Sequence, residues 1–350
     1  MKLSSRRGRI VAVVVVLVAL VGAVVGIVAS RRGAEPGAPT ATPTPAPTTE
    51  GPVNMAGRAP LTGLPATGPL DRPAIAVKIS NTPDAHPQRG VADADIVFVE
   101  PITTGTTRLA AIFQSKLPAE AGPVRSLRLM DAGLIGPTKG ILADAMAEQW
   151  VLDYIHRVAD LDDLGTLTVP AGTYHIDSTR RAPNHVFARP QKLLALSHRK
   201  AAPAPYFGYA PGLARSTAQL SGRPASAVTI GYGDTSTATW TYQRTSHRWA
   251  RTEQWAPRVV QATADNVMVL TMNRDTSFPR AKPSMTVIDV FNASGTLKLL
   301  TGDKVITGKW SKAGANDPFK FSTTDGKPLL LTPGTTWVEC PLTTMPVQLK

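Results

Sequence analysis

Ala74-Ile75-Ala76-Val77-Lys78-Ile79 is an apolar run of strand length with a single charge, and it predicts a buried β-strand. Two runs of the same kind follow it after polar loops, Asp95–Glu100 and Arg108–Phe113. A shorter apolar run, Ile141–Ala143, favours a further strand. Together these runs predict a buried sheet in the first part of the body of the protein.

Segments of helical composition lie between and after these strands. We expect helices at Ser126–Ile135, at Ala145–Val158 and at His185–Arg199, with Ser126 as the capping residue of the first. Strands that alternate with helices imply a mixed sheet. Residues 60–200 therefore read as an α/β domain.

The sequence pattern changes at about Ala225. From there on, short β-prone runs are separated by Gly, Pro, Asp and Asn. The predicted strands are Ala227–Tyr232, Ala238–Arg244, Arg248–Thr252, Val267–Met272, Met285–Phe291, Gly295–Leu300, Lys304–Trp310 and Thr335–Glu339. This spacing favours an antiparallel β-rich domain over 225–345, with 201–224 as the connection between the two domains. The fold class of the whole body is therefore α+β.

The N-terminal end carries an uncharged apolar run, Ile10–Ala29, with four basic residues before it and two after it. Twenty helical residues span about 30 Å, the thickness of the hydrocarbon core of a bilayer. The charge asymmetry predicts a cytoplasmic N-terminus, so we expect residues 1–32 to form a transmembrane anchor with the C-terminal body outside the cytoplasm. A cleaved signal is the alternative, and it would export the same body. Residues 33–59, rich in Pro, Ala and Thr, are expected to form an unstructured linker.

The charge of the exported part bears on its partners. The net charge is +13, and six of the 38 basic residues lie in 1–32, which leaves 32 basic against 25 acidic residues, or +7, for the remainder. A modestly basic body suits an anionic envelope polymer or a lipid surface. No basic-aromatic motif accompanies the charge, so a nucleic-acid partner is not expected. The chain has one cysteine, so it forms no intramolecular disulfide.

Sequence motifs of the common hydrolases are absent. We find no phosphate loop, no His-Glu-x-x-His helix and no Gly-x-Ser-x-Gly elbow. The six histidines show no metal-ligand spacing, so neither a metal nor another cofactor is expected. His86 and His185 lie in polar, proline-marked loops, where packing gives little reason for a histidine. They are candidates for acid–base catalysis, although each could also be a hydrogen-bonded loop anchor.

The densest polar cluster is Gly122-Pro123-Val124-Arg125-Ser126-Leu127-Arg128. If a helix begins here, Arg125 and Arg128 share a face near its N-terminus and could hold a phosphate or carboxylate. The alternative is an internal salt bridge to Glu100 or Asp131. Glu100 ends a predicted strand beside several threonines, so it is a candidate general base or a cap for the next loop.

Several of these residues also carry a resemblance to a known family. The matching segments are Asn81…Pro87-Gln88, Ala94–Val97, Thr107-Arg108, Ile112–Ser115, Gly122–Ser126, Ala182–His185, Trp240–Tyr242, Asn266-Val267, Gly308–Trp310 and Pro333-Gly334-x-x-Trp337. In this order they resemble the YerB-like family of bacterial envelope proteins of unknown function. The resemblance covers about residues 59–342 and implies two domains and an envelope location, but no reaction.

Three functions are consistent with these observations. The first is binding of an anionic envelope component, with Arg108, Arg125, Ser126 and Arg128 as ligand-binding residues, together with Asn81 and Gln88. The second is a hydrolase or transferase that acts on the cell wall. The third is a scaffold that contacts an envelope protein. Convergence of Glu100, Arg108, Arg125, Arg128 and His185 in one open cleft would favour an enzyme or a small-ligand site. Mutual burial of these residues at a domain interface would favour a structural role.

Overall fold

The computed structural model describes residues 51–103, 105–278, 280–282 and 284–350. The predicted membrane span at 10–29 and most of the predicted linker lie outside these residues. Within the described part of the chain, no helix is long and apolar enough to cross a bilayer.

The largest sheet has eleven strands and is mixed. In sheet order its strands are β17 (Lys320–Thr323), β16 (Lys304–Lys312), β15 (Ala293–Thr301), β14 (Asn266–Leu270), β19 (Thr336–Glu339), β2 (Ile96–Thr103), β3 (Thr106–Phe113), β1 (Ile75–Ser80), β4 (Ile141–Ala143) and β5 (Asp162–Asp163), and β9 (Arg223–Pro224) pairs with β16. The strands predicted first, β1, β2 and β3, are therefore neighbours at its centre.

The direction of the central strands defines a common edge. β1 and β2 are both antiparallel to β3, so they run in the same direction. β4 is parallel to β1, and β19 is parallel to β2. The C-terminal ends of β4, β1, β2 and β19 therefore meet at one edge of the sheet, which in open sheets is the usual place for a ligand site.

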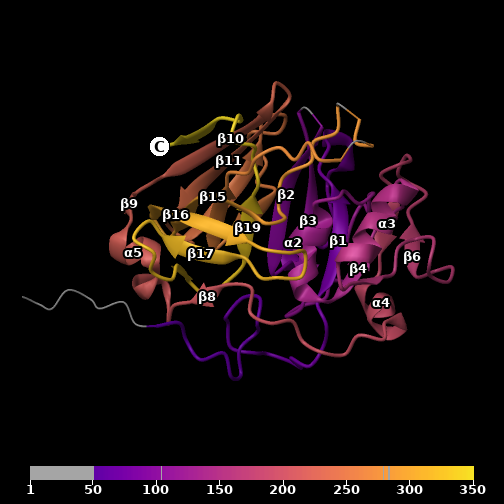
Figure 1. Cartoon of the computed structure of the whole chain (residues 1–350), viewed down its shortest axis with the longest axis horizontal. Helices are drawn as coiled ribbons and strands as arrows, with labels where there is room; N and C mark the ends of the chain where they lie inside the picture. Colours follow the sequence, from indigo (N-terminus) through magenta and orange to yellow (C-terminus); the bar gives the residue numbers. More distant parts are fainter. Residues whose placement is uncertain (1–50, 104, 279, 283) are drawn as a thin grey trace, which may run out of the picture. The chain divides into compact units, whose positions relative to one another are not determined.

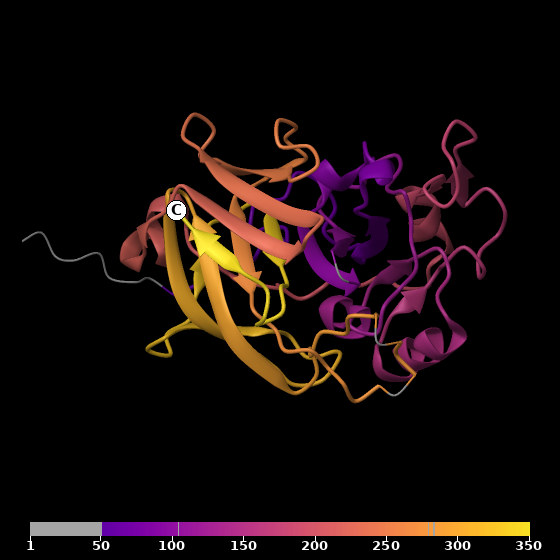
Figure 2. The same cartoon turned by 90° about the horizontal axis from the view of Figure 1, so that it is seen from above.

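A second sheet packs on one face of the first. It is antiparallel and five-stranded, in the order β13 (Ala262–Ala264), β12 (Arg248–Glu253), β11 (Ser236–Gln243), β10 (Ala227–Gly233) and β20 (Val347–Leu349). Trp240, Trp249 and Tyr232 from this sheet and Val97, Val99 and Leu109 from the large sheet belong to one buried core. Figure 2 shows the salmon strands of this sheet as a layer apart from the gold strands of the β15–β16 hairpin.

Short helices and connecting segments complete both cores of the protein. Ala132, Ile155 and Ala218 belong to the core on the opposite face of the large sheet, whereas Val91 and Leu193 belong to the core shared with the second sheet. The helices are η1 (Pro83–Ala85), η2 (Val91–Asp93), α2 (Asp131–Ile135), η3 (Gly136–Thr138), α3 (Gln149–Val158), α4 (Pro190–Leu196), η4 (Leu213–Arg215) and α5 (Thr217–Ser221). Two small strand pairs complete the fold, β6 (Tyr174–Ile176) with β7 (Val186–Ala188) and β8 (Gly208–Tyr209) with β18 (Leu330–Leu331). α2 and α3 lie beside the β1–β4 part of the sheet (Figure 1), where they help to enclose a second buried core.

The large sheet runs through both predicted domains, because β2 from the first part of the chain pairs with β19 from the last part. The segment 201–224 is not a bare connection, since it contains β8, η4, α5 and β9. The domain boundaries at 201–224 stay a prediction. The expectation of a purely antiparallel second part is wrong, because β19 is parallel to both β14 and β2.

Three predicted elements differ from the structure. No helix begins at Ser126, because 122–126 is extended beside β1 and α2 begins only at Asp131. The predicted helix at His185–Arg199 is divided, because Val186–Ala188 pairs with β6 and only Pro190–Leu196 is helical. Met285–Phe291 forms no strand and contributes one isolated bridge, between Ile288 and Arg274. The fold is nevertheless the β-rich α+β class that was expected.

Candidate functional site

Polar side chains gather at the edge where β1 and β2 end. Ser80 of β1 and Glu100 of β2 both stand opposite Arg108 of β3 in the strand register. Directly opposed residues project from the same face of a sheet, so these three side chains are neighbours. They lie on the face that α2 covers, at the end of its apolar core.

A buried cluster of ion pairs lies at this edge of the sheet. Lys78 is fully buried and forms ion pairs with Glu100 and with Asp131, whose Oδ1 lies 2.7 Å from its Nζ. Burial lowers the pKa of Lys78 to about 8. The charge of Asp131 opposes this shift, whereas the charges of Arg108 and Arg128 add to it. Glu100 and Asp131 are therefore engaged by Lys78, not by the arginines.

The segment 122–126 brings Arg125 to this edge by pairing with the end of β1. The Arg125 N–H donates to the carbonyl of Lys78 at 2.9 Å, and the Ser80 N–H donates to the carbonyl of Pro123 at 2.9 Å. Gly122 has φ +154°, and an added Cβ would lie 2.9 Å from the carbonyl oxygen of Val186. Only glycine fits this close approach without strain, which gives a structural reason for the Gly-Pro turn.

The three guanidinium groups of Arg108, Arg125 and Arg128 make few contacts with the protein. Arg108 Nη1 donates to the Ser126 carbonyl at 2.6 Å, and Arg128 Nη1 donates to the Leu127 carbonyl at 2.8 Å. Arg125 makes no side-chain hydrogen bond to any described residue, and the Nε atoms of Arg125 and Arg128 are buried without a partner. Within the described chain, none of the three forms an ion pair with a carboxylate.

Burial lowers the pKa values of all three arginines, and repulsion by neighbouring arginines adds to the shift for Arg108 and Arg125. Arg108 is only 7% exposed, and burial, followed by the charges of Arg128 and Arg125, lowers its pKa to about 9. Burial also lowers the pKa of Arg125, and the charge of Arg128 adds to that shift while Asp84 opposes it. The pKa of Arg128 is lowered by burial against the opposing charges of Asp131 and Glu148.

The arginines and the buried ion pairs together have an excess of positive charge. Lys78 and the three arginines carry four positive charges against the two negative charges of Glu100 and Asp131, whereas Asp84 and Glu148 act on Arg125 and Arg128 without forming ion pairs with them. Free guanidinium N–H groups in a partly desolvated setting bind carboxylates and phosphates through charge-assisted hydrogen bonds. An anion placed among Arg108, Arg125 and Arg128 would relieve their repulsion and supply the missing acceptors.

Asn81 and Gln88, the other two predicted ligand residues, lie on the opposite face of the same edge and bond to the protein. The Asn81 side-chain amide donates to Thr107 Oγ1 at 2.8 Å and to Glu253 Oε1 at 3.0 Å. The Gln88 amide donates to the Ser80 carbonyl at 2.6 Å and to Asn81 Oδ1 at 3.2 Å. These contacts connect the β1 edge to the second sheet and leave the two side chains less available to a ligand.

The two candidate histidines do not meet. His86 packs against Trp255, with ring centroids 4.6 Å apart, in a groove of about 430 Å³ between residues 86–92 and 255–261. Burial, with the charges of Arg251 and Arg180, lowers the pKa of His86 to about 4, so its ring is neutral at pH 7. His185 lies beside β7, and its Nδ1 is buried without a partner.

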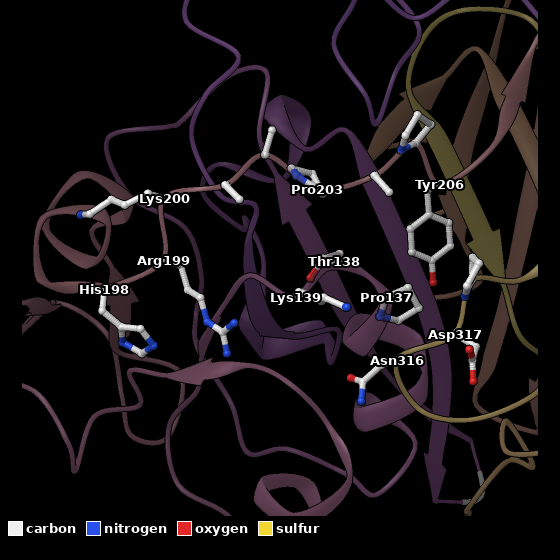
Figure 3. Close-up of a pocket in the computed structure, with 15 residues that line it drawn as sticks. Pro137, Thr138, Lys139, His198, Arg199, Lys200, Pro203, Tyr206, Asn316 and Asp317 are labelled. Atoms are coloured by element: carbon white, nitrogen blue, oxygen red, sulfur yellow. The ribbon is translucent and has the colours of Figure 1, made fainter.

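A larger groove of about 610 Å³ lies at the other edge of the sheet, where β4 begins (Figure 3). His198, Arg199 and Lys200 line one side of it, with Lys139 near the centre and Asn316 and Asp317 across from them. Its polar groups are largely engaged, because Arg199 pairs with Asp160 and the Asn316 amide donates to the Val158 carbonyl. Its larger volume alone therefore does not make this groove a better candidate for a ligand site than the arginine cluster.

Two groups of buried charges were missed by the sequence reasoning. The only signal for Lys78 was its isolation in an apolar strand. The second group is Arg251 with Glu253 and Glu339, which lies between the two sheets. Burial alone would lower the pKa of Arg251, but the charges of Glu253 and Glu339 outweigh it and raise that pKa. These carboxylates lie far apart in sequence and gave no local signal.

Within the described residues, no group of three or more His, Cys, Asp or Glu side chains is placed to hold a metal ion.

The fold and this edge define a β-rich protein with a cluster of arginines at one edge of its large sheet. Residues 61–203 match the N-terminal domain, and residues 228–338 the C-terminal domain, of the family described as "Protein of unknown function (DUF3048)". The chain belongs to this family, which confirms the YerB-like resemblance.

The chain is similar to a curated protein from Bacillus subtilis (strain 168) and to a solved structure from Bacillus subtilis. The first, "Putative lipoprotein YerB", is 48% identical over 73 residues, which are 20% of this chain and 22% of that protein. The match thus spans about a fifth of the relative's length. The second is the crystal structure of YerB protein, which aligns with a TM-score of 0.71 at 20% identity over 83% of this chain and 99% of that chain. At this identity the likeness shows the shared fold.

Proposed function

We propose that the protein is a membrane-tethered envelope protein that binds an anionic component of the cell envelope. The observation that carries the proposal is the cluster of Arg108, Arg125 and Arg128, because the nearby carboxylates Glu100 and Asp131 are taken by Lys78. Three partly buried guanidinium groups that repel one another are costly unless an anion joins them.

The proposed location rests on two observations. The relative from Bacillus subtilis carries the name of a lipoprotein, which describes a protein attached to a membrane by a lipid. This chain has no cysteine near its apolar run at 10–29, so the run itself would supply the attachment. The N-terminus would be cytoplasmic and the β-rich body extracytoplasmic.

The contacts favour binding over catalysis. A general base must reach its substrate, and Glu100 is fully buried in its ion pair with Lys78. His86 lies in a separate groove against Trp255, away from the arginines. The arginine cluster thus has donors for an anion but no evident acid–base partner among the predicted candidates.

The double substitution Arg125→Ala with Arg128→Ala tests the proposal. Hydrogen bonds to charged groups contribute about 1.5–3 kcal/mol each, so loss of these contacts should weaken binding to an anionic wall polymer at least tenfold. Binding would be measured by co-sedimentation of the full chain, in detergent, with the isolated polymer. Circular dichroism would establish that the variant remains folded.

The matched control removes the same charge elsewhere. Arg244 and Arg258 are exposed on the second half of the chain, and Arg244→Ala with Arg258→Ala should leave binding within about twofold of wild type. Equal weakening by both double variants would mean that net charge alone attracts the polymer. A wild-type protein that binds no anionic polymer would contradict the proposal outright.

A further inference from the structure

The groove of about 430 Å³ beside His86 differs in its lining from the larger groove of Figure 3. The larger groove is lined by charged residues, among them Lys139 and Arg199. None of the described residues that line the groove beside His86 is charged at pH 7, because burial, with the charges of Arg251 and Arg180, lowers the pKa of His86 to about 4. Charges are costly to strip of water, so this groove suits an uncharged ligand.

Apolar side chains form much of the wall of this groove. The Trp255 ring packs against His86, with ring centroids 4.6 Å apart. Val259 and Val260 follow on the same segment and are 59% and 55% exposed, and Val91 lies on the other segment. The groove therefore presents branched aliphatic side chains beside an aromatic ring, and a ligand that covers them removes apolar area from water.

A chain of hydrogen bonds joins the two sides of the groove. The Gln88 amide donates to Asn81 Oδ1 at 3.2 Å, and the Asn81 amide donates to Glu253 Oε1 at 3.0 Å. Arg251 Nη1 donates to the same Glu253 oxygen at 2.6 Å and to Gln261 Oε1 at 2.9 Å. Both ends of the chain, Gln88 and Gln261, line the groove. These internal contacts hold the two segments together, so the groove is formed before a ligand arrives.

Several polar atoms of the groove lack a partner within the described part of the chain. Gln261 Nε2 and His86 Nε2 are buried without a hydrogen bond. The Trp255 indole N–H and Gln88 Oε1 also have no partner among the described residues, whereas the Gln88 nitrogen is engaged. Buried polar groups in proteins are nearly always hydrogen-bonded, so these atoms favour a ligand that carries both an acceptor and a donor.

An amide group next to an aliphatic side chain matches both sets of features. Its carbonyl oxygen can accept from Trp255 or Gln261, and its N–H can donate to Gln88 Oε1. An acyl chain would cover the same polar atoms without bonding to them, which is unfavourable. A sugar would bury hydroxyl groups against Val259 and Val260, which is unfavourable for the same reason. A peptide presents the amide and the aliphatic side chain together.

We propose that this groove binds a peptide segment of another protein, with an aliphatic side chain against Trp255, Val259 and Val260 and the adjoining peptide groups bonded to Gln88 and Gln261. The groove shares no lining residue with the cluster of Arg108, Arg125 and Arg128. The inference therefore goes beyond the proposed function and does not depend on it.

The test titrates the full chain, isotopically labelled at tryptophan and held in a lipid nanodisc so that no detergent competes for the groove. The probes are two uncharged peptides, acetyl-Ala-Ala-Leu-Ala-Ala amide and the same peptide with alanine in place of leucine. The nuclear magnetic resonance signal of the Trp255 indole N–H, assigned with Trp255→Phe, reports occupancy. Wild type should bind the leucine peptide about tenfold more tightly, because burial of leucine removes more apolar area from water than burial of alanine.

Val259→Ser with Val260→Ser should weaken binding of the leucine peptide about tenfold, and the exposure of both residues protects the fold. Leu167→Ser with Ile176→Ser is the matched control, because it removes two exposed aliphatic side chains elsewhere and should leave the affinity within about twofold of wild type.

Three results would overturn the inference. They are a Trp255 signal that neither peptide moves, equal affinity for the two peptides, and equal weakening by the two double variants, which would mean adhesion to any exposed aliphatic residue. Tighter binding of N-acetylglucosamine than of the leucine peptide would also overturn it in favour of a sugar ligand. Arg125→Ala with Arg128→Ala should leave peptide binding unchanged, which separates this groove from the arginine cluster.

Discussion

Replacing Lys78 with methionine should be among the most destabilising single changes in this protein. Lys78, Glu100 and Asp131 are all fully buried, and Lys78 is the counter-charge of both carboxylates. Methionine keeps the length of the side chain but leaves two buried carboxylates without their cation. Removing one partner of a buried ion pair typically costs about 3–5 kcal/mol, a large part of the 5–15 kcal/mol that stabilises a folded domain.

Thermal unfolding followed by circular dichroism measures this effect. At about 2 °C per kcal/mol for a body of this size, Lys78→Met should lower Tm by about 6–10 °C. The double variant Lys78→Met with Glu100→Gln removes one uncompensated charge, so it should be more stable than the sum of the two single changes implies. A Tm for Lys78→Met within 2 °C of wild type would refute the assignment of Lys78 as the buried counter-charge.

Burial and the charge of Asp163 raise the pKa of Asp144 to about 8, so the stability that its protonated form provides is full below about pH 4 and is lost as the pH rises toward 8. Wild-type Tm should therefore fall between pH 5 and pH 8, and Asp144→Asn should flatten that decline; an unchanged slope would contradict the shift. If the two predicted domains fold separately, limited proteolysis should cut 201–224 soon after the linker, whereas resistance there with one unfolding transition would make 60–345 a single unit. A reporter enzyme fused after Thr49 should be active only outside the cytoplasm, and cytoplasmic activity would overturn the predicted topology.

Local sequence pattern was sufficient for the strands that lie at the centre of the sheet. The apolar runs at 74–79, 95–100 and 108–113 correspond to β1, β2 and β3, because buried central strands are apolar on both faces. Local sequence pattern gave the wrong prediction where contacts between residues distant in sequence determine the backbone conformation. The segment 122–126 has helical neighbours in sequence, but hydrogen bonds to β1 hold it extended.

The candidate site, too, could be predicted from the sequence only in part. Arg125 and Arg128 were singled out from their density of charge, and in the structure they lie with Arg108 without an ion pair to any described carboxylate. The partner of Glu100 was not found, because Lys78 is 22 positions away and meets it only through the pairing of β1 and β2 with β3. Asn81 and Gln88 were proposed as ligand-binding residues, yet the structure uses them in internal hydrogen bonds. The sequence pointed to the arginines, and only the fold showed that Lys78 already pairs with the carboxylates Glu100 and Asp131.

Locating a bound anion directly is the strongest test of the proposed site. Crystals of the full chain would be soaked with tungstate, a phosphate mimic whose metal is visible by anomalous scattering. A peak is expected within hydrogen-bond distance of Arg108, Arg125 and Arg128, and it should be lost in the Arg125→Ala, Arg128→Ala variant. A peak confined to the groove beside Lys139, Arg199 and Lys200, or no ordered peak in wild type, would contradict the proposed site.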